Sequence, residues 1–360
     1  MSKRYVLDAR VATPHFPGIG RYTRALHAAI LPQLATGDTL ATIQTDASQL
    51  WVNGATISAK SGNFSLAQQR EIPRLLRQHK ADLYHSPYYL MPFRPNTPTV
   101  VTIYDGIAFH YPEYLSTRAR LLFRFAHWLA IRAADALIAI SEATKRDLVR
   151  YFNPQKPIYV TPLAAAPHFR PTDSAEIRRK FHLPDQYLLY FGSNKPHKNI
   201  VTLIRAVAKL PDAPLLVVAG AWLPAHPEAK IEVERLGLAD RVRFLGRIDS
   251  ADVAPLYSGA TAFIFPTRYE GFGLPVIEAM ACGTAVACGK VWSLPEVGRE
   301  AVAYFDPNSA ESIAHTIDLL LQNNAHRHDL VQRGLQQAAR FSWERTAQQT
   351  LTIYRELLSS

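Results

Sequence analysis

The chain has only two cysteines, no long hydrophobic run and no Asp-x-Asp pair. Cys282 and Cys288 are too few for a disulfide-rich scaffold or a four-cysteine zinc site, and their small-residue surroundings predict buried thiols. No apolar run approaches the roughly 18 residues that a bilayer-spanning helix needs, and the first residues lead into an apolar strand rather than a signal-like segment. We therefore expect a cytoplasmic protein, and a peripheral position on the inner face of a membrane stays open.

Length and composition predict a folded protein of two domains. The 360 residues are 48% hydrophobic and 19% charged, which is a globular balance, and one domain usually contains about 100–200 residues. Lys and Arg total 40 against 30 Asp and Glu, a formal net charge of +10 with histidine neutral. This excess favours an anionic partner such as nucleotide phosphate or an acidic membrane surface. Nucleic acid is disfavoured, because neither an aromatic-interleaved basic module nor a helix-turn-helix pattern occurs.

Short apolar runs, each followed by a longer helical pattern, recur along both halves of the chain. Such strands alternating with helices predict parallel sheets covered on both faces, hence two doubly wound α/β domains. The predicted strands of the first half are Tyr5–Leu7, Asp82–His85, Thr99–Ile103, Ala136–Ile140 and Ile158–Thr161. Those of the second half are Tyr187–Phe191, Leu215–Ala219, Val242–Leu245, Ala262–Phe265 and Ala285–Ala287.

Prolines mark the expected boundary between the domains. The stretch 162–185 contains four prolines around a charged segment, which is typical of a linker. We place an N-terminal domain at residues 1–168 and a C-terminal domain at residues 169–342. A last helix follows at about 343–358, with Ser342 as its N-cap.

The strongest site pattern follows the predicted strand Ala262–Phe265. Glu270 lies in the loop at the C-terminal end of this strand, where Gly271 and Gly273 let the backbone approach a ligand closely. The free amides at Leu274 begin the next helix, and a helix N-terminus is suited to phosphate. The pattern therefore predicts an anionic ligand with a carboxylate beside it.

A second carboxylate, Glu278, lies about one turn inside that helix. A carboxylate can accept two hydrogen bonds from the diol of a ribose or hexose. This interpretation predicts a sugar nucleotide, with the diphosphate at the helix, the ribose at Glu278 and the transferred sugar at Glu270. The alternative for Glu278 is an ordinary solvated helix residue.

Glu270 and Glu278, with Gly271-Phe272-Gly273-Leu274-Pro275 between them, resemble the signature of the retaining glycosyltransferases of family 4. The resemblance extends through most of the chain and is strongest in its C-terminal half. It implies the α/β GT-B fold, in which two Rossmann-like domains with parallel sheets face a central cleft and the C-terminal helix, here 343–360, packs back on the first domain. It also implies that Glu270 is catalytic and that Gly271, Phe272, Gly273, Leu274 and Glu278 bind the donor.

The resemblance implies transfer of a hexose from a nucleoside diphosphate sugar to a hydroxyl of a glycan, lipid-linked or small-molecule acceptor, with retained configuration. The chain looks most like mannosyltransferases of polysaccharide assembly, so GDP-mannose is the first donor expected, ahead of UDP-hexoses. An epimerase or phosphorylase of the same fold, or a non-catalytic nucleotide-sugar-binding protein, is the alternative, because a fold alone does not define a function.

The turn after Tyr187–Phe191 carries further candidates for donor binding. The resemblance implies that Lys198 grips the diphosphate as a point charge and takes part in catalysis. It also implies a second charge from Lys195 and a donor contact at Ser193. The arginine often found beside the lysine is absent, and His197 stands there. For each lysine, a solvated surface group is the alternative.

Two segments of the first half complete the candidates. Gly18-Ile19-Gly20-Arg21-Tyr22 resembles the family's N-terminal glycine-rich loop, which implies that Gly18 and Gly20 bind the donor; a dinucleotide fingerprint fits poorly, because Thr23 replaces its third glycine. After Thr99–Ile103, Tyr104 stands where many relatives have a histidine, and Asp105 follows. We assign Tyr104 to the donor sugar and Asp105 to the acceptor hydroxyl as catalytic candidates. Interface packing is the alternative for Tyr104, and His110, which matches no family position, has no assigned role.

No metal and no cofactor beyond the donor substrate are expected. In the other common glycosyltransferase architecture, an Asp-x-Asp pair holds the metal-bound diphosphate, and this chain has no such pair.

One predicted helix, Ser116–Arg132, is basic and amphipathic. Its apolar face would carry Leu122, Phe125 and Leu129, and another face would carry Arg120, Arg124 and His127. A helix of this kind can bind an anionic membrane, and an ordinary solvated face is the alternative.

Overall fold

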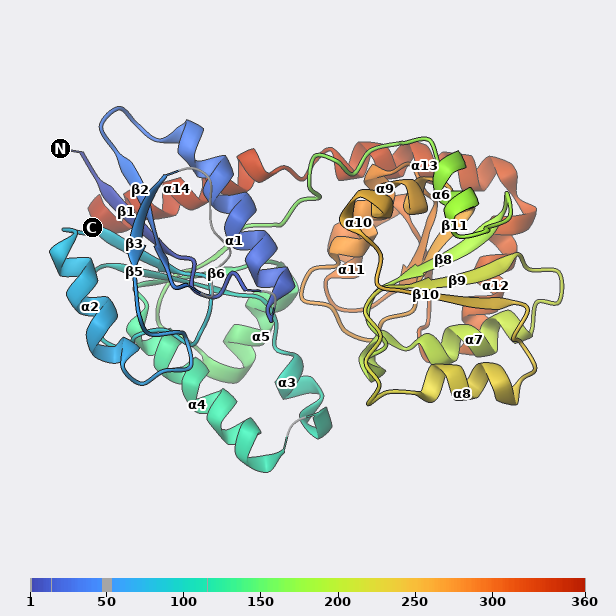
Figure 1. Cartoon of the computed structure of the whole chain (residues 1–360), viewed down its shortest axis with the longest axis horizontal. Coiled ribbons are helices and arrows are strands. Elements are labelled where there is room, and N and C mark those ends of the chain that lie inside the picture. Colours follow the sequence, from blue (N-terminus) through green and yellow to red (C-terminus); the bar gives the residue numbers. More distant parts are fainter. Residues whose placement is uncertain (1, 14, 47–53, 115, 360) are drawn as a thin grey trace. The chain divides into compact units, whose positions relative to one another are not determined.

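The computed structural model describes residues 2–13, 15–46, 54–114 and 116–359. The chain divides into two compact units, Met1–Leu163 together with Ser342–Ser360, and Ala164–Phe341. Each unit is built around one parallel sheet with helices on both faces (Figure 1).

The first unit contains a seven-stranded sheet of order β3-β2-β1-β4-β5-β6-β7, the Rossmann order with one strand added. Its strands are β1 Arg4–Asp8, β2 Thr39–Gln44, β3 Ala55–Ser58, β4 Leu83–Ser86, β5 Thr99–Ile103, β6 Ala136–Ala139 and β7 Ile158–Val160. Its helices are α1 Pro17–Ile30, α2 Gln68–Gln78, α3 Ile107–His110, α4 Thr117–Ala133, α5 Glu142–Phe152 and α14 Trp343–Ser359, with the 3-10 turns η1 Leu31–Gln33 and η2 Pro112–Tyr114.

The second unit contains a six-stranded sheet of order β10-β9-β8-β11-β12-β13, which is again the Rossmann order. Its strands are β8 Tyr187–Phe191, β9 Leu215–Ala219, β10 Val242–Gly246, β11 Ala262–Phe265, β12 Val286–Gly289 and β13 Ala303–Phe305. Its helices are α6 Ala175–Lys180, α7 Ile200–Ala208, α8 Glu228–Arg235, α9 Ser250–Ser258, α10 Leu274–Ala281, α11 Leu294–Gly298, α12 Ala310–Gln322 and α13 Asn324–Ala338, with the 3-10 turns η3 Pro196–Lys198 and η4 Arg299–Ala301.

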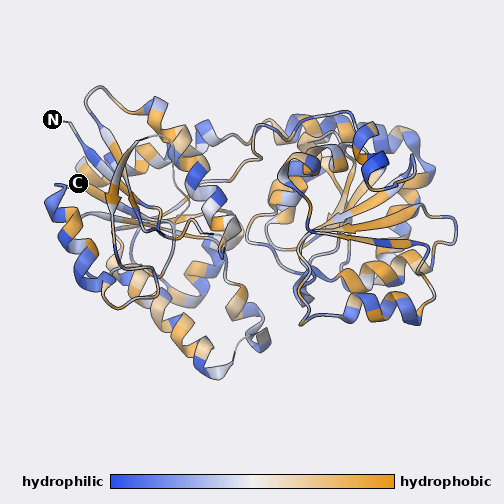
Figure 2. Cartoon of the chain, in the orientation of Figure 1, coloured by the Kyte–Doolittle hydropathy of each residue, from blue (hydrophilic) through white to orange (hydrophobic). Residues whose placement is uncertain are grey.

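Burial on both faces explains the composition of the central strands. Every residue of β5 and β6 is buried, as is every residue of β11 and β12. Such strands are rich in apolar residues, because neither face meets water. Each large apolar side chain removed from water contributes about 1.5–3 kcal/mol to folding. Figure 2 shows the result as a concentration of hydrophobic residues in the two sheets.

The fold class expected from the sequence is confirmed: the chain forms two parallel-sheet α/β domains. All ten predicted strands occur, with bounds that differ by at most two residues. The sequence pattern missed β2, β3 and β13. Strand β3 has one buried residue at the edge of its sheet, so its sequence shows no continuous apolar run. Strand β13 has only three residues, and two of them are only partly buried.

Helix α14 is joined to the first unit by polar contacts as well as by packing. Ser342 accepts a hydrogen bond from Arg345 N at 3.2 Å, which confirms it as the N-cap. Thr346 Oγ1 donates to Pro162 O at 2.6 Å. The buried hydroxyl of Tyr354 lies 2.6 Å from His85 Nδ1. The last helix therefore belongs to the core of the unit that begins the chain.

Helix α4 corrects one detail of the predicted amphipathic helix. His127 does not share a solvent-facing basic side with Arg120 and Arg124, because it is 3% exposed and stacks on Tyr89 with 3.8 Å between ring centroids. Burial lowers the pKa of His127 to about 3, so this residue adds no positive charge near pH 7. Among the described helices, none has the length and hydropathy required to cross a membrane.

Candidate active site

Lys198 and Glu270 meet at the carboxyl edge of the second sheet. Strands β8 and β11 are neighbours, so the loops that follow them lie side by side. Lys198 Nζ lies 2.5 Å from Glu270 Oε1, and the two side chains are 18% and 13% exposed. The structure thus brings two of the predicted catalytic residues together as a partly buried ion pair.

Hydrogen bonds between the two loops fix this pair. Asn199, in the left-handed region with φ 61°, donates from Nδ2 to Pro266 O at 3.0 Å. His197 O accepts hydrogen bonds from Arg268 N at 2.8 Å and from Thr267 Oγ1 at 3.2 Å. Burial, together with the nearby positive charge of Lys198, lowers the pKa of His197 to about 3. His197 is therefore neutral and does not replace the missing arginine as a cation.

The glycine-rich loop after Glu270 has a backbone that requires glycine. Gly273 precedes α10 with φ 101°, and a Cβ at this position would lie 2.5 Å from Leu294 Cδ2. Ser293, which is fully buried, donates from Oγ to both Glu270 O and Phe272 O at 2.9 Å. These contacts hold the loop at the start of α10, whose first-turn amides have no partner inside the helix.

The remaining predicted donor-binding residues of the second unit differ in exposure. Glu278 is 3% exposed in α10, which rules out the alternative of a solvated surface residue. Phe272 is also buried, with its ring 5.8 Å from that of Phe341. Ser193 is half-buried, and its carbonyl accepts a hydrogen bond from the Tyr190 hydroxyl at 2.7 Å. Lys195 is exposed at the start of the turn η3 that carries Lys198.

Tyr104 and Asp105 lie at the carboxyl edge of the sheet in the first unit, directly after β5. The Tyr104 hydroxyl is buried and has no hydrogen-bond partner among the described residues. Its ring contacts the edge of the Tyr22 ring, with 5.3 Å between centroids, and burial raises the pKa of Tyr104 well above its usual value. Asp105 Oδ1 accepts a hydrogen bond from Ile107 N at 3.1 Å.

Gly18 and Gly20 do not form the expected glycine-rich loop. Both lie in the first turn of helix α1, which begins at Pro17. Proline favours the start of a helix because its fixed φ suits the first turn, and this local preference overrides the loop that the resemblance implied. A Cβ on Gly20 would lie 3.3 Å from Ala12 Cα, so a small residue is needed there, whereas Gly18 has open space.

The sequence pattern missed an aromatic cavity at the same edge of the second sheet. The cavity has a volume of about 200 Å³ and spans the carboxyl ends of β8, β9 and β10. Trp222 stands 5.3 Å from the Phe244 ring at 81°, and Lys230 Nζ lies 4.7 Å from the Trp222 centroid. Asn194 holds the Trp222 loop by accepting from Leu223 N at 2.7 Å. In the sequence, this cavity is marked by Gly192 and Gly220, which directly follow β8 and β9.

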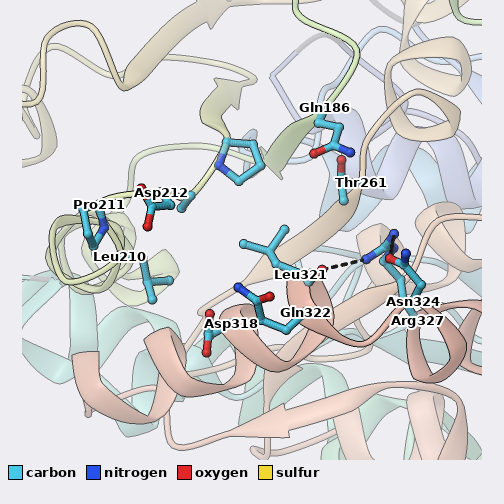
Figure 3. A pocket seen from close by; sticks show the side chains of 12 residues that line it. Gln186, Leu210, Pro211, Asp212, Thr261, Asp318, Leu321, Gln322, Asn324 and Arg327 are labelled. Carbon is cyan, nitrogen blue, oxygen red and sulfur yellow. Dashed lines mark hydrogen bonds between the residues drawn. The ribbon is translucent and has the colours of Figure 1, made fainter.

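A second cavity lies at the opposite edge of this sheet. Figure 3 shows the side chains that line it, and its volume is about 330 Å³. Gln186 and Thr261 directly precede β8 and β11, so the cavity is at the amino ends of these strands. It contains none of the predicted site residues.

Within the described ranges, no three His, Cys, Asp or Glu side chains gather into a group that could hold a metal ion. The two cysteines are buried, as expected, and burial raises the pKa of Cys282 to about 12. Metal independence stays a prediction.

The structure defines a class of protein with two Rossmann-like α/β domains. Comparisons with known proteins identify the family. A model described as "Glycosyl transferases group 1" matches residues 173–337, and one described as "Glycosyltransferase Family 4" matches residues 48–165. O-antigen chain mannosyltransferase B of Escherichia coli is 33% identical over 304 residues, which is 82% of this chain and 79% of that protein. The chain belongs to the group 1, family 4 glycosyltransferases.

Further relatives match parts of longer proteins or the fold alone. The serotype-specific mannosyltransferase WbdA of Escherichia coli is 32% identical over 243 residues, 63% of this chain but only 29% of that protein. Anabaena Alr3699/HepE in complex with UDP and glucose superposes with a TM-score of 0.79 at 19% identity, covering 99% of this chain and 100% of that one. Sucrose-phosphate synthase from Thermosynechococcus elongatus gives 0.77 at 22% identity, covering 99% of each chain. These structures confirm the GT-B fold.

Proposed function

We propose that the protein transfers mannose from GDP-mannose to a hydroxyl of a glycan acceptor, with retained configuration and without a metal ion. The observation that carries this proposal is the Lys198–Glu270 pair beside the glycine-capped start of α10. The mannosyltransferase names of the relatives that are 32–33% identical support the choice of sugar. A lipid-linked or small-molecule acceptor and a UDP-hexose donor are the alternatives.

The diphosphate is assigned to Lys198 and to the amides that begin α10. An ammonium group has three N–H donors, so one ion pair with Glu270 leaves capacity for phosphate oxygens. The N-terminus of α10 adds a partial positive charge. Lys195, three residues before Lys198, supplies a second positive charge at the rim of the site. This arrangement stabilises the charge that develops as the diphosphate leaves.

The two carboxylates are assigned to hydroxyl groups of the donor. Glu270 accepts hydrogen bonds from the transferred sugar, and Glu278 accepts them from the ribose. Glu278 supports this assignment by its place in α10, the helix that begins at the site loop. The acceptor oxygen attacks the anomeric carbon on the face from which the diphosphate leaves, and a phosphate oxygen takes the acceptor proton.

The nucleobase is assigned to the aromatic cavity around Trp222. This cavity extends from the end of β8, which carries the Lys198 turn, to β9 and β10 on the side away from β11. A base placed there would lie along the sheet edge from the diphosphate, beside the aromatic rings of Trp222 and Phe244. Trp222→Ala should weaken the binding of GDP while leaving the binding of inorganic pyrophosphate unchanged.

Tyr104 and Asp105 are assigned to the reacting groups from the first unit. The buried Tyr104 hydroxyl has no hydrogen-bond partner among the residues that the structure describes, and an unmade hydrogen bond in such a place costs about 1–3 kcal/mol. A hydroxyl of the donor sugar would satisfy it. Asp105 orients the acceptor hydroxyl.

A thermal-shift screen against nucleoside diphosphate sugars, followed by a transfer assay with NMR of the early product, tests the proposal. A ligand present at 100 times its Kd stabilises the protein by about 2.7 kcal/mol, so GDP-mannose should give the largest shift. Retention requires the same anomeric configuration in product and donor, and EDTA should leave the rate unchanged. An inverted product would contradict the mechanism. Binding without turnover on any glycan acceptor would favour the non-catalytic alternative, and interconversion of the donor would favour an epimerase.

We also propose that α4 binds an anionic membrane surface. Four of its large apolar side chains are solvent-exposed: Leu121 at 65%, Leu122 at 67%, Phe125 at 56% and Trp128 at 46%. The helix carries four arginines and no acidic residue, which complements anionic lipid headgroups. Flotation with liposomes that contain phosphatidylglycerol should carry the protein upward at low salt. The double variant Leu122→Ser/Phe125→Ser should abolish flotation. Recovery of the wild-type protein only in the bottom layer of the gradient would refute the proposal.

A further inference from the structure

One face of α5 contacts the segment 104–110 at both ends of the segment. Thr144 Oγ1 donates to Tyr104 O at 3.0 Å. Asp147 Oδ1 lies 2.8 Å from His110 Nε2, and the Tyr151 hydroxyl lies 3.3 Å from His110 Nδ1. Thr144, Asp147 and Tyr151 are spaced i, i+3 and i+7, so they share one face of the helix.

The segment also packs closely on α5 between these two anchors. Gly106 is buried, and a Cβ at this position would lie 2.8 Å from Asp147 Oδ2. No larger residue fits unless the Asp147 carboxylate moves. Asp105 lies between the anchors at Tyr104 and His110, and its carboxylate accepts from Ile107 N inside the same segment. The backbone on both sides of Asp105 is therefore held by α5.

The partners of His110 define its tautomer. A carboxylate only accepts hydrogen bonds, so Nε2 carries the proton and donates it to Asp147. In the neutral ring, the other nitrogen, Nδ1, accepts from the Tyr151 hydroxyl. Tyr151 is itself fixed by stacking on Phe109, with 4.7 Å between ring centroids. Both nitrogens of the imidazole are directed at α5.

We propose that His110 and Asp147 are positioning residues that hold Tyr104 and Asp105 in place for sugar transfer, and that His110 transfers no proton in the reaction. This inference rests on the proposed function, because Asp105 is the group assigned to the acceptor. The side chains of His110 and Asp147 are 11% and 7% exposed. Their hydrogen bond is thus largely shielded from water. Hydrogen bonds are stronger in such a low-dielectric environment than in water.

Kinetics of paired variants at His110 separate positioning from proton transfer. His110→Ala should lower kcat by about 100-fold, the loss typical of a reacting group displaced by about 1 Å, while the KM for the donor stays within twofold. His110→Gln keeps an N–H that reaches Asp147, so it should regain at least a tenth of the wild-type kcat. A proton-transfer role predicts instead that Gln is as poor as Ala, because an amide does not titrate.

Two further variants control for loss of structure. Val149→Ser changes an exposed residue of the same helix, 48% exposed, and should keep wild-type kinetics. Asp147→Asn keeps an acceptor for His110 and should retain more activity than Asp147→Ala. Melting temperatures identify any variant that fails through unfolding. If an Ala variant unfolds, the kinetics of the Gln or Asn variant at that position are compared with the wild type instead.

Hydrogen exchange tests the positioning without any assumption about the reaction. The amides of residues 104–111 should exchange faster in His110→Ala than in the wild type, whereas those of β8 and β11 should not change. Unchanged exchange, or equal kcat losses for His110→Ala and His110→Gln, would overturn the inference. Absence of transfer by the wild-type protein would instead refute the proposed function, and the exchange result would still decide whether α5 orders the segment.

Discussion

Replacing Lys198 with alanine should weaken the binding of GDP by about 10- to 100-fold. A hydrogen bond to a charged group contributes about 1.5–3 kcal/mol, and each 1.4 kcal/mol corresponds to about a tenfold change in Kd. Because Lys198 is 18% exposed, the contact is only partly screened by water, and the loss should persist at moderate salt.

The same substitution should also lower the stability of the free protein. It leaves the Glu270 carboxylate, 13% exposed, without its cation. Exposed pairs contribute about 0–1 kcal/mol and loss of one partner of a buried pair costs about 3–5 kcal/mol, so this partly buried pair should account for about 1–3 kcal/mol. Glu270→Gln in the Lys198→Ala background should recover part of that loss, since no unpaired charge remains.

Isothermal titration calorimetry with GDP, at fixed pH and ionic strength, measures the first effect. Lys209→Ala is the matched control: it removes the same charge, but from an exposed pair with Glu311 in which the side chains are 47% and 72% exposed. The control should leave the Kd of GDP unchanged and cost less than about 1 kcal/mol of stability. If Lys198→Ala bound GDP within twofold of the wild type, the assignment of Lys198 to the diphosphate would be wrong.

Three further outcomes follow from the buried groups. Glu278→Ala should weaken GDP-mannose binding in calorimetry by about tenfold, the cost of one hydrogen bond to a charged group, and preserved affinity would contradict its ribose role. Removal of residues 342–360 should abolish the cooperative thermal transition of the first unit, because it deletes the buried Tyr354 and its bond to His85; an unchanged melting temperature would show that α14 is dispensable. Burial lowers the pKa values of His85 and His127 to about 3, against about 6.5 in the unfolded chain. Between about pH 3 and 6.5, the unfolded state therefore binds more protons than the folded state. As the pH drops through this range, the free energy of unfolding should fall by up to about 1.4 kcal/mol per pH unit for each histidine. Urea denaturation of His127→Phe across that range should show a shallower loss than the wild type.

Most of the fold was predictable from the sequence because the central strands are rich in apolar residues. Strand β11, for example, consists of four buried apolar residues followed directly by Pro266 and the site loop. Strand β3 has one buried residue, and its pairing with β2 depends on the sheet already being present. Pairing between distant segments of this kind has no local signature.

The sequence indicated candidate site residues but not the contacts between them. Glycine spacing and the carboxylates indicated the α10 loop, and the family resemblance implied a role for Lys198. That Lys198 pairs with Glu270 could not be read from the sequence, because it depends on β8 and β11 being adjacent. The burial of His127 was missed for a related reason, since helical periodicity shows which residues share a face but not which face meets the sheet.

The pairing of Lys198 with Glu270 leads to a final prediction about product release. When a sugar is attached, its hydroxyls give Glu270 hydrogen bonds, but after transfer the carboxylate stands near the bare diphosphate. Two like charges about 4 Å apart repel by about 1–4 kcal/mol, depending on how much water screens them, and this repulsion lowers affinity for GDP relative to GDP-mannose. Glu270→Gln should therefore tighten GDP binding by about tenfold or more, while GDP-mannose binding improves less or weakens, because the neutral amide gives the sugar hydroxyls a poorer acceptor. Calorimetry with both ligands measures the ratio directly. Equal changes in the two affinities would show that Glu270 faces neither the sugar nor the phosphate, and that its only role is to hold Lys198.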